Sequence, residues 1–109
     1  MVQGSIPVQK VYEDSGFICI RDIRPQAKIH LLVIPKIHVA SLDEVFPVEG
    51  QSSADLVGKL FETGTQIARQ EGLLPRGFRS VINTGAGGGQ TIFHLHLHLM
   101  GGDVLSEKA

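Results

Sequence analysis

Sulfur, tryptophan and long apolar runs are scarce in this 109-residue sequence. Cys19 is its only cysteine, which excludes an intramolecular disulfide and any Cys-x-x-Cys metal site. There is no tryptophan, and no apolar run approaches the roughly 20 residues that a membrane-spanning helix needs. Residues 1–7 lack the basic start and apolar stretch of a secretory signal. We therefore expect a cytoplasmic protein that does not bind membranes.

Charge of one sign is not in excess either. The formal net charge is -1, so the overall field does not draw the chain onto a nucleic-acid backbone, and we expect no nucleic-acid partner. Apolar residues make up 42% and charged residues 19%, as in an ordinary globular domain. The length is typical of one hydrophobic core. We expect residues 1–109 to form a single domain that holds any bound anion by local groups.

Short β-branched and aromatic runs separated by turn residues predict five strands. The first two runs flank Glu13-Asp14-Ser15-Gly16, whose acidic, serine and glycine residues are typical of a hairpin turn. Pro35 ends the third run, which we expect to be central, because proline has no N–H for the ladder. In the last run, polar and apolar residues alternate, as expected for a strand with one buried face. The predicted strands are residues 8–12, 17–22, 29–34, 78–83 and 91–100.

Two segments predict helices. Ser41 and Glu44 have the spacing of a capping box, which predicts a short helix starting there. Residues 53–70 carry apolar side chains at steps of three and four, and Gly72 supplies a stop, so one long amphipathic helix is expected. Because tight turns join most strands, the fold class should be α+β, with a mainly antiparallel sheet and the helices on one face.

A row of histidines is the strongest functional signal. In a strand, successive side chains point to opposite faces, so His94, His96 and His98 should share one face while the intervening leucines face the core. A single histidine on a polar face is usually structural or solvated. Three in register favour a built site, because histidine is otherwise uncommon.

Zinc binding and nucleophilic catalysis are the two chemistries that such a row could support. Two of the histidines could chelate zinc, but the outer pair lie about 13 Å apart at Cα, and only His30 and His38 remain as further imidazoles. An ordinary imidazole, with a pKa of about 6.5, is mostly neutral at pH 7 and can attack phosphorus. We favour the nucleophile and expect neither a metal nor a cofactor.

A glycine-rich stretch precedes the histidines. Residues 83–91 offer glycine N–H groups that can approach an anion closely, followed by the Gln90 amide and the Thr91 hydroxyl. The stretch matches neither the P-loop nor the dinucleotide-binding fingerprint. Its position beside the histidines nevertheless favours a phosphate site.

These residues resemble a known family. Residues 90–99 look like the signature of the histidine triad (HIT) superfamily, and residues 22–27 and 30–38 resemble further segments of it. Gly101-Gly102 and residues 88–90 resemble the Hint branch, which comprises purine-nucleoside phosphoramidate hydrolases. The resemblance implies a HIT-like fold with a five-stranded sheet, one long and one short helix, and a homodimer whose two sheets join into one.

The resemblance also implies catalytic roles. His96 would attack the α-phosphorus of a purine nucleotide conjugate and form a nucleotidyl-histidine, which water then hydrolyses. His98, Thr91 and Gln90 would bind the phosphate oxygens. His94 would orient His96, with His30 behind it as a proton relay.

Nucleotide contacts follow from the same resemblance. Asp22 would accept hydrogen bonds from the ribose hydroxyls, Ile20 and Ile23 would flank the base, and Asn83 would contact ribose or phosphate. The implied nucleotide-binding set is Asp22, Ile20, Ile23, Asn83, Gly89, Gln90, Thr91, His96 and His98.

The expected reaction is hydrolysis of a nucleoside 5′-phosphoramidate or acyl-nucleotide. Two alternatives stay open: cleavage of dinucleoside polyphosphates or nucleotidyl transfer, and a nucleotide-binding interaction module with incidental catalysis. Family members usually carry residues before the segment matching 2–7 that cover the base, so a more open base pocket is expected here. The tail, residues 103–109, lacks the Trp-Pro ending of animal Hint proteins.

Overall fold

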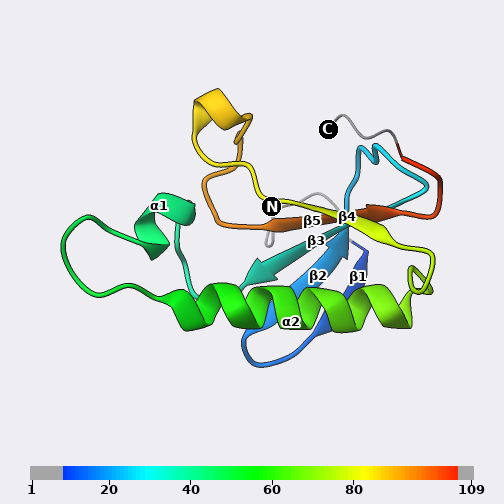
Figure 1. Cartoon of the computed structure of the whole chain (residues 1–109), viewed down its shortest axis with the longest axis horizontal. Coiled ribbons are helices and arrows are strands. Elements are labelled where there is room, and N and C mark those ends of the chain that lie inside the picture. Colours follow the sequence, from blue (N-terminus) through cyan, green and yellow to red (C-terminus); the bar gives the residue numbers. More distant parts are fainter. Residues whose placement is uncertain (1–8, 106–109) are drawn as a thin grey trace.

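One sheet with strand order β1-β2-β3-β5-β4 organises the molecule, and two helices lie beside it (Figure 1). The computed structural model describes residues 9–105. All four strand pairings in this range are antiparallel. The α+β class, the five-stranded antiparallel sheet and the central place of the third strand are therefore confirmed.

The strands agree with the sequence pattern except at the last one. They are β1 Lys10–Glu13, β2 Phe17–Arg21, β3 Ile29–Pro35, β4 Phe78–Val81 and β5 Leu97–Gly101. The Asp14 carboxylate accepts the N–H groups of Gly16 and Phe17, both at 2.8 Å, and so builds the predicted turn between β1 and β2. The expectations for residue 8, for the segment before it and for residues 106–109 lie outside the described range.

Residues 91–96 are not in a strand, so the predicted strand 91–100 was wrong from residue 91 to residue 96. The ladder between β3 and β5 ends at the pair Val33 and Leu97. In this register Ile34 would pair with His96 and Pro35 with Leu95, and Pro35 has no N–H to donate to the ladder. On the other side β4 stops at Val81, opposite His98. Without partners on either side, the chain leaves the sheet before Leu97.

The helices are α1 Leu42–Val45 and α2 Ala54–Gln70. The capping box was wrong in detail: Ser41 is the N-cap residue of α1 but its side chain makes no capping bond. Its hydroxyl instead donates to the Asp43 carboxylate, and the Glu44 carboxylate accepts the N–H of Ala40 at 3.2 Å. Glu44 thus reaches one residue further back than a capping box requires. No helix in the described range is long and apolar enough to cross a membrane.

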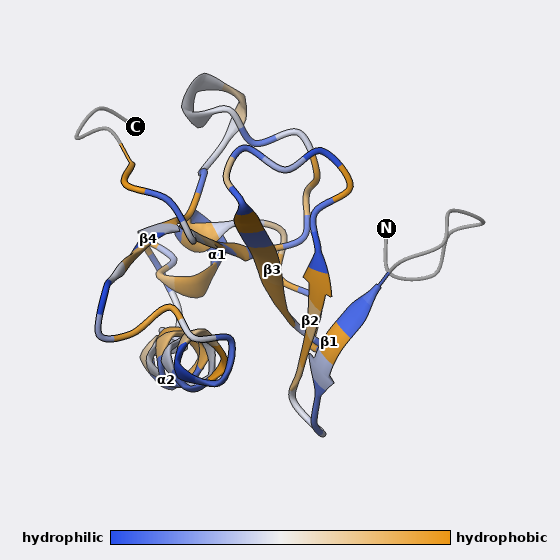
Figure 2. Ribbon diagram, turned by 90° about the vertical axis from the view of Figure 1, so that its right-hand side faces the viewer, coloured by the Kyte–Doolittle hydropathy of each residue, from blue (hydrophilic) through white to orange (hydrophobic). Residues whose placement is uncertain are grey.

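The two faces of the sheet have different uses. Helix α2, seen along its axis in Figure 2, packs on one face against β3 and β5. The leucines of the histidine segment join this core, since Leu95, Leu97 and Leu99 are at most 1% exposed. The opposite face carries a second buried cluster on β2 and β3, made of Ile18, Ile20, Leu32 and Ile34. The alternation of the strands therefore leaves this second face for a site.

Candidate functional site

A cavity of about 830 Å³ opens on the sheet face opposite α2. Residues paired across the strands place side chains from β2, β3, β5 and β4 in rows on this face, one of them running from Ile20 through Leu32 and His98 to Val81. The predicted site residues that line the cavity are Ile20, Asp22, Ile23, His30, Asn83, Gly89, Thr91, His96 and His98. The structure brings these nine together, whereas His94 and Gln90 are not part of the lining.

His96 is held in a defined tautomer. Its Nδ1 lies 2.7 Å from the carbonyl oxygen of His94. A carbonyl oxygen can only accept, so Nδ1 carries the hydrogen and Nε2 keeps the lone pair when the ring is neutral. The residue is 8% exposed and lines the cavity. The ring therefore has the electronic arrangement of a nitrogen nucleophile.

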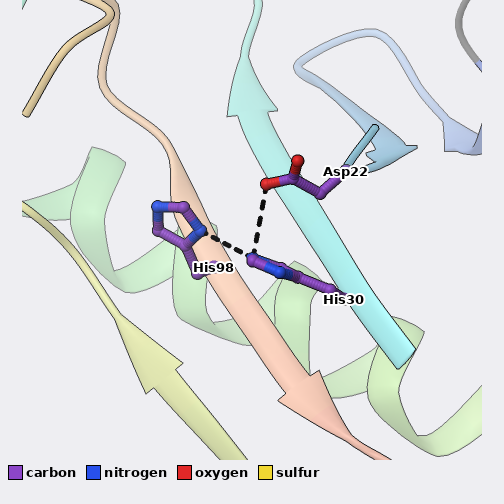
Figure 3. A group of neighbouring side chains, drawn as sticks. All are labelled: Asp22, His30 and His98. Atoms are coloured by element: carbon purple, nitrogen blue, oxygen red, sulfur yellow. Dashed lines mark hydrogen bonds and ion pairs between the residues drawn. The ribbon is translucent and has the colours of Figure 1, made fainter. Parts of the chain in front are cut away.

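A chain of hydrogen bonds fixes His98 as well (Figure 3). The backbone N–H of Gln26 donates to His30 Nδ1 at 3.0 Å, so neutral His30 carries its hydrogen on Nε2. That Nε2 lies 2.9 Å from His98 Nδ1 and 3.5 Å from the Asp22 carboxylate. His98 accepts at Nδ1, which leaves its own Nε2–H free to donate to a ligand.

Burial supports the neutral forms that this chain requires. Desolvation, helped by the neighbouring His96 and His30, lowers the pKa of His98 to about 4. Desolvation also lowers the pKa of His30, against the opposing pull of the Asp22 carboxylate. Near pH 7 both rings are neutral, so hydrogen bonding rather than ring charge determines their roles.

Within residues 9–105, Asp22, His30 and His98 form a group that could hold a metal ion. Each offers one ligand atom, and these atoms lie within 4.8 Å of one another. To bind a metal through Nε2, His30 would have to carry its hydrogen on Nδ1, where the Gln26 N–H points. The local hydrogen bonding therefore favours the proton chain over a metal at this position.

His94 lies apart from the other two histidines of the row. Its Nε2 donates to the carbonyl oxygen of Pro35 at 2.7 Å, and its Nδ1 lies 3.5 Å from Nδ1 of His38. It contacts His96 through its backbone carbonyl, not through its ring. His30 lies beside His98, and His38, which the sequence did not place in the site, lies beside His94.

The glycine-rich loop uses much of its own hydrogen bonding internally. Three of its N–H groups donate to carbonyl oxygens inside the loop. Gly88 and Gln90 both donate to Gly85, and Gly89 donates to Ala86. The Asn83 side chain donates to the Gly88 carbonyl at 2.8 Å. Gly85 and Gly89 have φ of 70° and 86°, which glycine adopts without strain. The Gly89 N–H is thus already engaged, although the residue lines the cavity.

Sequence reasoning missed Leu32, Val81, Arg79 and Met100, which also line the cavity. The alternation of side chains along a strand could have identified two of them. Met100 continues the spacing of His96 and His98, and Leu32 follows His30 by two residues. Arg79 and Val81 alternate on β4 in the same way, but a four-residue strand is too short to show which side faces the core.

Similarity to known proteins extends over nearly the whole chain. A family model described as HIT domain matches residues 3–105. Protein HitA of Neisseria gonorrhoeae is 48% identical over 96 residues, which are 88% of this chain and 85% of that protein. The purine nucleoside phosphoramidase of Escherichia coli K12 is 36% identical over 102 residues, 94% of this chain and 82% of that relative. A HIT family hydrolase of Legionella pneumophila superposes with a TM-score of 0.86 at 39% identity, covering 99% of this chain and 93% of that structure.

Proposed function

The chain belongs to the HIT family, and from that premise we propose that it hydrolyses nucleoside 5′-phosphoramidates or acyl-nucleotides and releases a nucleoside monophosphate. One observation carries the proposal: the lone pair of His96 Nε2 and the N–H donor of His98 belong to neighbouring rings, with centroids 5.0 Å apart, in the same cavity. The name of the Escherichia coli relative, a purine nucleoside phosphoramidase, supports the choice of substrate class.

The first step is displacement at phosphorus. The lone pair of His96 Nε2 forms a bond to the α-phosphorus, and the bond from phosphorus to the leaving nitrogen or acyl oxygen breaks with its electron pair. A leaving amine takes up one proton as it departs, whereas a leaving carboxylate needs none. The His98 Nε2–H donates to a phosphate oxygen and stabilises the charge that develops there.

The second step returns the enzyme to its starting state. Water attacks the phosphorus of the nucleotidyl-His96, the bond from phosphorus to nitrogen breaks, and the electron pair returns to Nε2. The water releases one proton, which balances the proton taken up by a leaving amine. The products are a nucleoside monophosphate and an amine or a carboxylate.

The rest of the cavity suits a nucleotide. The Asp22 carboxylate would accept hydrogen bonds from the ribose hydroxyls, and Ile20 and Ile23 would flank a purine base. The Thr91 hydroxyl would join His98 at the phosphate. Asn83 at the cavity wall would contact ribose or phosphate. The volume of about 830 Å³ lies in the range of small-molecule sites.

The proposal extends to assembly and location. In the described range β4 lies at an edge of the sheet and pairs only with β5, so its outer N–H and C=O groups are available to a second copy. We propose a homodimer in which two sheets join, working in the cytoplasm. The single thiol, Cys19, is buried, in keeping with a reducing compartment.

Release of AMP from adenosine 5′-phosphoramidate in the presence of a strong chelator tests the function. We expect turnover by the wild-type protein, and its loss by at least roughly 1,000-fold in His96→Ala with AMP binding retained, as expected when a covalent nucleophile is removed. Turnover retained by His96→Ala would exclude His96 as the nucleophile, and loss of activity with the chelator would support a metal.

Two further results, from a second substrate and from AMP binding, would favour one of the alternative functions. Faster cleavage of a dinucleoside polyphosphate than of the phosphoramidate would indicate that alternative substrate, because one covalent intermediate serves both reactions. Tight AMP binding without turnover of either substrate would indicate a nucleotide-binding module.

A further inference from the structure

Gln90 is buried, at 4% exposure, and every hydrogen-bonding group of its side-chain amide is in use. Its Nε2 donates to the carbonyl of Ala40 at 2.7 Å and to that of Ile92 at 3.0 Å. Its Oε1 accepts the N–H of Gly85 at 2.8 Å. An amide nitrogen has two hydrogens, so no donor is left for a phosphate oxygen.

These bonds hold the segment that leads into β5. Residues 91–96 lie outside the strands and have no ladder to fix them. Donors from residues 90–95 instead bond to carbonyls at the end of β3 and in the loop that follows it. Gln90 Nε2 donates to Ala40, His94 Nε2 to Pro35 and the Leu95 N–H to Val39. Gln90 is the first of the three and the one that also joins the glycine-rich loop.

We propose that Gln90 is a positioning residue, which fixes residues 91–96 against residues 35–40 and does not itself bind the phosphate. The inference rests on the proposed function, and it replaces the expectation that the Gln90 amide would bind phosphate oxygens. Gln90 acts on His96, whose tautomer depends on the carbonyl of His94 inside the segment that Gln90 holds.

The isosteric change Gln90→Glu isolates this role. Glutamate keeps an acceptor for the Gly85 N–H but removes both donors, and its carboxylate then faces the carbonyls of Ala40 and Ile92. Displacing reacting groups by a fraction of an ångström to an ångström can cost up to about 100-fold in rate. We expect kcat to fall roughly 10- to 100-fold while KM and the Kd for AMP change by less than about threefold. The matched control is Gln70→Glu, the same change at an exposed position of α2, which should leave kcat unaltered.

A measurement on the wild-type protein is independent of turnover and of the stability of the variant. The Gln90 side-chain NH₂ group, followed by nuclear magnetic resonance, should exchange slowly with solvent in the free protein. Its resonances should shift little when AMP is added, because its partners are backbone carbonyls. This resonance measurement can still be interpreted if hydrolysis of the phosphoramidate is not observed.

Each result has a definite meaning. Slow exchange and small shifts, together with a selective loss of kcat in Gln90→Glu, support the positioning role. Fast exchange in the free protein, or a large shift on adding AMP, would show an amide that is free to bind phosphate and would overturn it. A Gln90→Glu protein with unchanged kcat and a sharply weakened affinity for AMP would overturn it as well.

Discussion

At the scale of single residues, the site is a set of tautomers fixed by backbone groups. The carbonyl of His94 sets the hydrogen of His96 on Nδ1, and the N–H of Gln26 sets that of His30 on Nε2. Each backbone group determines the protonation pattern of a ring that lines the cavity. In the proposed reaction, the backbone thereby prepares His96 to attack and, through His30, His98 to donate before any substrate arrives.

Two substitutions of His30 test this arrangement. The amide nitrogen of Gln can occupy the place of the ring Nε2, whereas Asn reaches only the place of Nδ1. We expect His30→Gln to keep a donor to His98 and to retain several times more kcat than His30→Asn. Steady-state kinetics of the two variants, with unfolding curves to show equal folding, provide the comparison. Equal kcat in the two would mean that the bond from His30 to His98 has no part in turnover.

Stability should depend on pH through His98. Its pKa of about 4 in the folded protein lies below the ordinary value of 6.5, so between these values the unfolded chain binds more protons. The free energy of unfolding is therefore expected to be highest above pH 6.5 and to fall as the pH drops toward 4. Urea unfolding across this range measures the slope. His98→Gln should reduce the slope, and an unaltered slope would assign the effect to other groups.

At the scale of elements, the sequence predicted what depends on local pattern. Periodicity was sufficient for α2 and for the strands, and it also separated the buried leucines from His96 and His98. It failed at residues 91–96, because the start of β5 at Leu97 depends on Pro35, which lies in another strand far earlier in the chain. It could not show that His94 turns toward His38, since that contact forms only between two loops.

The fit of α2 on the sheet can be tested at its two glycines. A Cβ at Gly64 would lie 2.9 Å from Leu97 Cδ2, whereas a Cβ at Gly58 would meet nothing within 4 Å. We expect Gly64→Val to destabilise the protein by about 1–3 kcal/mol through overpacking. Gly58→Ala should stabilise it by about 0.5–1 kcal/mol, because alanine favours the helix. Urea unfolding of both variants measures this, and a neutral Gly64→Val would show that Leu97 moves aside at no cost.

At the scale of the whole molecule, the sheet has the main hydrophobic core on one face and the candidate site on the other. Helix α2 and the leucines occupy one face, and the cavity with its histidines occupies the other. The candidate site residues came from the resemblance and from the histidine spacing, and nine of them line one cavity. The positioning role proposed for Gln90 could not be predicted from the sequence. A glutamine whose buried amide bonds to three backbone groups and a glutamine that binds phosphate at the surface look the same in a sequence.

The alternation through Leu95, His96, Leu97 and His98 also limits how this protein can change during evolution. Core and cavity are made by neighbouring residues of one short stretch, so inserting or deleting a single residue there would exchange the two faces. Histidines would enter the core and leucines would enter the cavity, and both folding and activity would be lost together. Residues 46–53, which are exposed and connect the two helices, face no such constraint. Lineages of this chain should therefore vary in length between the helices while the histidine stretch keeps a fixed length.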